Sequence, residues 1–82
     1  MQSRRPVALA SLEHSLDLMI ELYVDWREAC TAVVAAWENF KHAEVGLGDI
    51  AFRTYAAALD REEQVARRYQ RAVEQVARAP AA

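Results

Sequence analysis

The chain has 82 residues, more than half of them apolar, and a formal net charge of −2 at pH 7. This length allows one domain with a marginal core, a single cysteine excludes an intrachain disulfide, and no apolar run approaches the ~18 residues needed to cross a membrane. The high apolar content, with two Gly and two Pro, also excludes a disordered chain. Association with another chain is therefore the expected source of additional stability.

The first predicted element is a long helix over about residues 7–44. Pro6 suits the first turn of a helix, and neither Gly nor Pro occurs again before Gly46. Apolar residues in this stretch recur every three or four positions: Leu9, Leu12, Leu16, Met19, Tyr23, Trp26, Cys30, Val33, Trp37 and Phe40. This spacing is the heptad pattern of a helix packed against partner helices.

A turn is predicted over residues 45–49 and a second helix over about 50–78. Gly46 can adopt the left-handed conformation that ends a helix, and Asp49 is expected to cap the next one. So short a connection makes the helices antiparallel, which predicts an all-α, two-helix hairpin forming one domain. The ends, residues 1–5 and 79–82, are expected to be flexible. Facing residues should have numbers that add to 92–94, which places Trp37 against Tyr55.

The apolar arc of the first helix is wider than one neighbouring helix can cover, because Leu18, Leu22, Ala29 and Ala36 extend it along one flank. This predicts self-association, as a twofold dimer that forms a four-helix bundle. The residues predicted at the dimer interface are Leu18, Leu22, Ala29, Val33, Ala36 and Phe40.

Glu62 is the one charged residue predicted within the apolar arc of the second helix. It is interpreted either as a structural carboxylate, bonded to the Trp26 indole, a Tyr hydroxyl or Arg27, or as a ligand for a metal or small molecule. The candidate polar site comprises Glu62, Trp26, Arg27, Cys30 and Tyr69. Inward-facing Glu-x-x-His motifs, which ferritin-like metal sites require, are absent from the sequence, so no metal or cofactor is expected.

A stripe of arginines is predicted on the outward side of the second helix: Arg53, Arg61, Arg67, Arg68, Arg71 and Arg78. It could contact nucleic acid or an acidic protein, or be an ordinary solvated face with Glu-to-Arg pairs four residues apart. The net charge is negative and no aromatic residue shares the stripe, which argues against nucleic acid. The solvated face is the preferred interpretation.

The sequence contains no Ser/His/Asp set, no glycine-rich phosphate loop and no cysteine pair. It therefore predicts a non-catalytic interaction or assembly protein. A cytoplasmic location is the default, because the Arg4-Arg5 start lacks the apolar run of an export signal. Two alternatives stay open: ligand binding at Glu62, and one half of a complex with a different helical protein.

The hairpin plan, with tryptophans on the first helix, is similar to that of the WXG100 secretion-system proteins. The family's Trp-x-Gly turn would fall at Gly46-Leu47-Gly48, where this chain has no Trp. Its C-terminal Tyr-x-x-x-Asp/Glu motif is also missing, because Val73 follows Tyr69 at that spacing. The sequence therefore indicates a shared plan without family membership.

Overall fold

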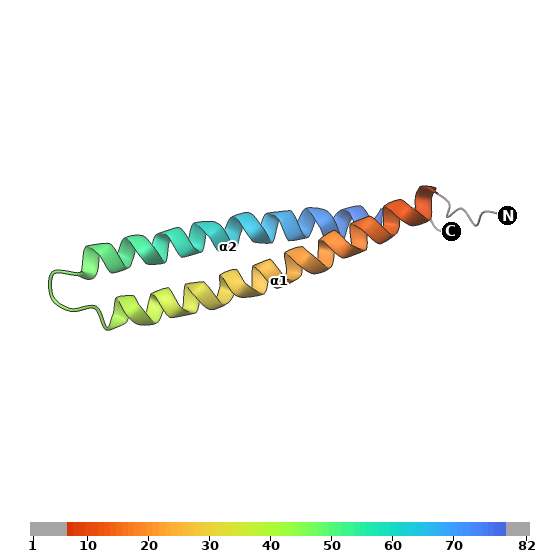
Figure 1. The fold of residues 1–82 in the computed structure, drawn as a ribbon. Coiled ribbons are helices and arrows are strands. Elements are labelled where there is room, and N and C mark those ends of the chain that lie inside the picture. Colours follow the sequence, from red (N-terminus) through yellow and green to blue (C-terminus); the bar gives the residue numbers. More distant parts are fainter. Residues whose placement is uncertain (1–6, 79–82) are drawn as a thin grey trace.

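The computed structural model describes residues 7–78, which form two antiparallel helices joined by a short turn (Figure 1). Helix α1 spans Val7–Lys41 and helix α2 spans Gly48–Ala77. The predicted all-α hairpin is confirmed. The first turns of α1 extend beyond the end of α2 (Figure 1). The ends predicted to be flexible, residues 1–5 and 79–82, lie outside the described residues. Within residues 7–78, neither helix has an apolar stretch long enough to cross a membrane.

The turn is closed by a backbone hydrogen bond in which the N–H of Leu47 donates to the carbonyl oxygen of Glu44, at 2.9 Å. Gly46 has φ of 93°, the left-handed conformation expected for it. Helix α1 ends at Lys41 and not near residue 44 as predicted, and just beyond it the N–H of Ala43 donates to the carbonyl oxygen of Phe40 at 3.3 Å. The predicted Asp49 cap is wrong: α2 begins one residue earlier, and Asp49 lies in its first turn, where a carboxylate complements the helix dipole.

Small residues form the contact between the helices, which we call the first seam. Within residues 9–78 the buried hydrophobic side chains are Ala29, Ala36, Val65 and Ala72, and Ser15 is also buried. On each helix the buried alanines and Val65 repeat every seven residues, and partly buried residues alternate with them. The partly buried members are Leu12, Met19, Leu22, Trp26, Val33 and Phe40 on α1, Ala43 just after α1, and Ala51, Tyr55, Ala58, Glu62, Tyr69 and Val76 on α2.

Aromatic rings fix how the two helices are aligned. Trp26 stacks on Tyr69 with ring centroids 5.9 Å apart, and Trp37 contacts Tyr55 at 5.3 Å, as predicted. Near the turn, Phe40 contacts the rings of both Phe52 and Tyr55. The numbers in each interhelical pair add to 92 or 95, which agrees with the predicted register to within one residue.

The first seam is rotated relative to the stripe predicted on α1. Tyr23 and Trp37 are 44% and 41% exposed, so they lie beside the contact and not inside it. Ala29 and Ala36, at 2% and 5% exposure, occupy its centre. The physical reason is that alanines allow two helix backbones to approach closely, whereas large aromatic side chains hold them apart and fit better along the edges.

This rotation corrects the predicted dimer interface. Ala29 and Ala36 are already covered by α2, so they offer no surface to a second chain. Leu22, Val33 and Phe40 are partly buried in the same seam, and Phe40 touches α2 through its ring contacts. Of the six predicted interface residues, Leu18 alone is exposed, at 36%.

Candidate functional site

A second set of positions, spaced like the first seam, runs along one side of the hairpin. On α1 it contains Leu16, Ile20, Tyr23, Arg27, Cys30, Val34, Trp37 and Lys41, which step alternately by four and three residues. On α2 it contains Phe52, Ala56, Leu59, Glu63, Ala66, Gln70, Val73 and Ala77, with the same steps. We call the surface formed by these residues the open face.

The two halves of the open face lie on the same side of the hairpin. An antiparallel helix pair has an approximate twofold axis perpendicular to its plane, so equivalent heptad positions of the two helices share a side. The open-face rings of Tyr23 and Phe52 reach across the first seam and contact Tyr69 and Phe40 of the opposite helix, each with ring centroids 5.7 Å apart. The open face is therefore one continuous surface along both helices.

The open face exposes seven large apolar side chains: Ile20, Tyr23, Val34, Trp37, Phe52, Leu59 and Val73, each between 38% and 62% exposed. From these fractions they present roughly 700 Å² to solvent, close to the ~800 Å² that each partner contributes to a standard protein interface. Monomeric soluble proteins rarely expose contiguous apolar patches above a few hundred Å². This surface thus has the size and composition of an interaction site.

The opposite side of the hairpin carries charged side chains from both helices. There α1 presents Glu21, Asp25 and Glu28, and α2 presents Arg61 and Arg68, all exposed. The surface hollow on that side is lined by residues of both helices: Leu18, Leu22, Arg68, Arg71, Ala72 and Gln75. The hairpin therefore has one apolar and one charged side, which is the arrangement expected of a subunit whose apolar side is covered in an assembly.

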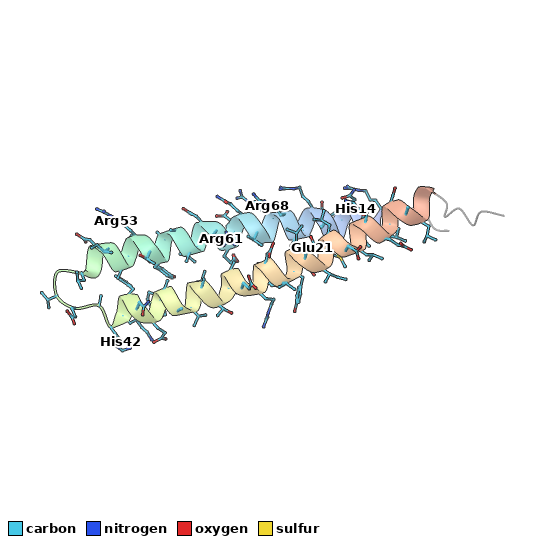
Figure 2. All side chains as sticks on the ribbon, viewed as in Figure 1. His14, Glu21, His42, Arg53, Arg61 and Arg68 are labelled. Atoms are coloured by element: carbon cyan, nitrogen blue, oxygen red, sulfur yellow. The ribbon has the colours of Figure 1, made fainter. Side chains whose placement is uncertain are left out.

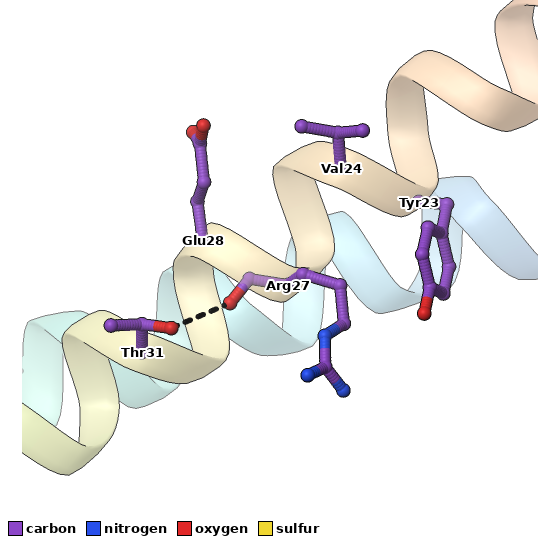
Figure 3. A pocket seen from close by; sticks show the side chains of 5 residues that line it. All are labelled: Tyr23, Val24, Arg27, Glu28 and Thr31. Atoms are coloured by element: carbon purple, nitrogen blue, oxygen red, sulfur yellow. Dashed lines mark hydrogen bonds between the residues drawn. The ribbon is translucent and has the colours of Figure 1, made fainter.

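Near the middle of α1, Tyr23 and Arg27 extend to the same side of the helix, while Val24 and Glu28 extend to another (Figure 3). These four residues and Thr31 line a shallow depression in which the Thr31 hydroxyl donates to the Arg27 carbonyl oxygen at 3.1 Å. Within residues 7–78 the guanidinium of Arg27 has no ion-pair partner. A cationic group is thus available beside the apolar part of the open face.

The candidate polar site is brought together only in part. Trp26 and Tyr69 stack, and the indole Nε1 of Trp26 is buried without a hydrogen-bond partner. Glu62 is partly buried in the first seam, as predicted, but within residues 7–78 its carboxylate makes no hydrogen bond or ion pair with Trp26, Arg27 or another side chain. Cys30 is a partly buried free thiol of the open face.

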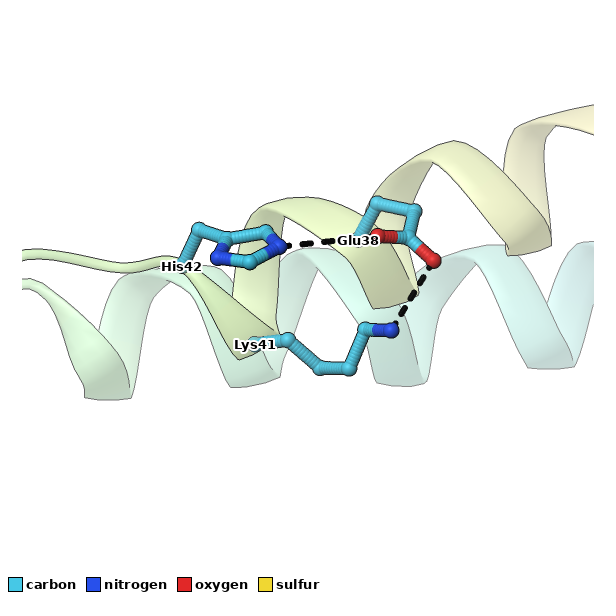
Figure 4. Close-up of polar contacts among 3 residues, drawn as sticks. All are labelled: Glu38, Lys41 and His42. Carbon is cyan, nitrogen blue, oxygen red and sulfur yellow. Dashed lines mark ion pairs between the residues drawn. The ribbon is translucent and has the colours of Figure 1, made fainter.

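Over the described residues, no three His, Cys, Asp or Glu side chains gather in a way that could hold a metal ion. Glu38 forms ion pairs with Lys41 at 3.0 Å and with Nε2 of His42 at 3.7 Å (Figure 4). His42 projects from the side of α1 away from α2 (Figure 2).

The predicted arginine stripe lies on the exposed outer surface of α2, and Arg53 and Arg68 visibly project away from the helix (Figure 2). The sequence predicts pairs four residues apart at Asp49–Arg53, Glu63–Arg67 and Glu74–Arg78, and among the described residues the pair between Glu63 and Arg67 is formed. Glu74 instead accepts a hydrogen bond from Nε2 of Gln70 at 3.3 Å. Glu63 belongs to the open face, so the stripe meets that face at the Glu63–Arg67 pair.

Comparison with family models, with curated proteins and with solved structures finds no match to this chain. The site is therefore described by its own geometry. The open face was not identified from the sequence, although the signal is present: Phe52, Leu59, Ala66 and Val73 recur every seven residues, directly beside the small residues that mark the first seam.

Proposed function

We propose that this protein is a non-catalytic assembly module that self-associates, two hairpins packing their open faces together to form a four-helix bundle. The observation that carries the proposal is the continuous apolar surface of roughly 700 Å² on one side of a hairpin whose own core is thin. Within residues 9–78 that core consists of four buried hydrophobic side chains, three of them alanines. Burial of the open face would add the apolar area that a two-helix layer cannot supply alone.

A matched pair of leucines tests the proposal. Leu59 lies on the open face at 41% exposure, and Leu18 lies on the opposite, charged side at 36%. The solution mass of wild type, Leu59→Glu and Leu18→Glu is measured by light scattering over a range of concentrations, with helix content followed by circular dichroism.

We expect a dimer for the wild type and for Leu18→Glu, and a shift of Leu59→Glu to monomer by at least tenfold in dissociation constant, because a charge would be buried without a partner. A monomeric wild type would contradict self-association and favour a different helical protein as partner. Dissociation by Leu18→Glu alone would place the interface on the other side of the hairpin.

A further inference from the structure

The open face permits two twofold arrangements, and its charges distinguish them. If the axis runs along the hairpin, α1 of one copy packs on α2 of the other, and both turns lie at the same end. If the axis runs across the hairpin, α1 packs on α1 and α2 on α2, and the turns lie at opposite ends. Both arrangements cover the same apolar residues, so apolar area alone does not choose between them.

Three charged residues interrupt the open face. Arg27 and Lys41 belong to α1, and Glu63 belongs to α2. On each helix the open face has an inner row of residues next to the first seam and an outer row farther from it. All three charged residues lie in the outer row, seven or fourteen residues from an apolar member of that row, such as Val34 on α1 or Ala56 on α2. The face of α1 is thus cationic at these points and the face of α2 is anionic.

With the axis along the hairpin, the rotation does not shift any residue along the helix direction. A residue of α1 therefore lies level with the same α2 residues in the second copy as in its own chain. Arg27 then lies level with about residues 65–68 of the second copy, within about one helical turn of its Glu63. Arg27 has no ion-pair partner within residues 7–78 of its own chain. Glu63 already pairs with Arg67, but a carboxylate has lone pairs for a second donor.

With the axis across the hairpin, the two open faces overlap most when the axis passes near the middle of the paired helices. Arg27 then lies within about one helical turn of Arg27 in the second copy, and Glu63 lies similarly close to Glu63. Like charges next to one another at an interface weaken association, whereas opposite charges fix the orientation of the partners.

We infer that the second copy binds with its turn at the same end, so that α1 of each chain covers α2 of the other and Arg27 pairs with Glu63 across the interface. This inference rests on the proposed self-association and adds the orientation of the copies. It makes Arg27 and Glu63 the residues that determine orientation, while Tyr23, Trp37 and Leu59 supply the buried area.

The distance between the two turns tests the orientation. Val45 is fully exposed at the turn, so a spin label is attached at Val45→Cys in a Cys30→Ala background, and the distance between copies is measured by pulsed electron paramagnetic resonance. We expect about 20–35 Å between labels, from helix spacings of 8–10 Å within a bundle plus the label arms. Turns at opposite ends would be about 50 Å or more apart, at 1.5 Å per residue.

A label at Glu28→Cys, on the exposed surface near the middle of α1, is the control, because both arrangements keep this pair within roughly 40 Å. Light scattering on the same labelled samples gives their mass. A dimer with a long Val45 distance would overturn the orientation and leave self-association intact. A monomer would overturn both, so the two failures are distinguishable.

Charge reversal provides a second, independent measurement. Arg27→Glu should weaken the dimer by roughly tenfold, since two ion pairs are replaced by two repulsive ones, and Arg27→Glu combined with Glu63→Arg should restore most of the affinity. Arg61→Glu, an exposed arginine on the opposite side of α2, is the matched control and should leave the dissociation constant unchanged. Failure of the double variant to recover affinity would overturn the pairing.

Discussion

Replacement of Ala29 by Leu tests whether small residues set the distance between α1 and α2. Ala29 is 2% exposed, and its level on α1 places it opposite Val65, itself buried at 5%. A leucine there adds three carbon atoms to a contact with no free space, so the helices must separate or the side chain must adopt a strained rotamer. Overpacking of this kind costs about 1–3 kcal/mol, which lowers the melting temperature by roughly 5–20 °C for a chain of this size.

The melting temperature is measured by circular dichroism at one fixed protein concentration, because self-association makes it concentration-dependent. Ala35→Leu is the matched control: Ala35 is exposed on α1, and the same substitution there should change the free energy of unfolding by less than about 0.5 kcal/mol. An Ala29→Leu variant with unchanged or higher melting temperature would refute a close alanine contact, and the position would then resemble an ordinary leucine site between more distant helices.

The remaining predictions concern the turn and Glu62. Gly46→Ala should lower stability by about 1 kcal/mol, because φ of 93° is strained for a side chain, whereas Gly48→Ala in the first turn of α2, with nothing within 4 Å of the added carbon, should raise it by about 0.4–1 kcal/mol. Equal effects of the two in thermal denaturation would contradict this reading of the turn. Glu62→Leu should raise the free energy of unfolding by about 1–2 kcal/mol, since it replaces a carboxylate that has no hydrogen-bond or ion-pair partner among residues 7–78 by an apolar group, while Glu62→Gln should change it by less than about 0.5 kcal/mol. A lower melting temperature for Glu62→Leu would indicate that the carboxylate has a stabilising partner in the assembled protein.

The candidate site could be predicted only in part. Periodicity correctly placed Glu62 within the contact between the helices and the arginines outside it. It did not identify the open face, because Ala29 and Ala36 were assigned to a dimer contact and Tyr23 and Trp37 to the intrachain seam. A wide apolar arc gives two adjacent stripes of similar spacing, and hydrophobicity does not say which stripe meets the neighbouring helix of the same chain.

The sequence by itself determined the helices and their connection. The long interval without Gly or Pro permits one continuous helix, Gly46 supplies the conformation that ends it, and a connection of a few residues requires the two helices to lie antiparallel. These are local properties of the backbone, so they can be read from neighbouring residues.

The tertiary structure alone decided which side of each helix is covered. Contact between helices depends on how closely the backbones approach and on where large rings can be accommodated, and both depend on residues distant in the sequence. Ala29 and Ala36 of α1 and Val65 and Ala72 of α2 are buried between the helices, which leaves Tyr23, Trp37, Phe52 and Leu59 exposed on one side. That choice, made between two nearly equivalent stripes, creates the open face on which the proposed assembly rests.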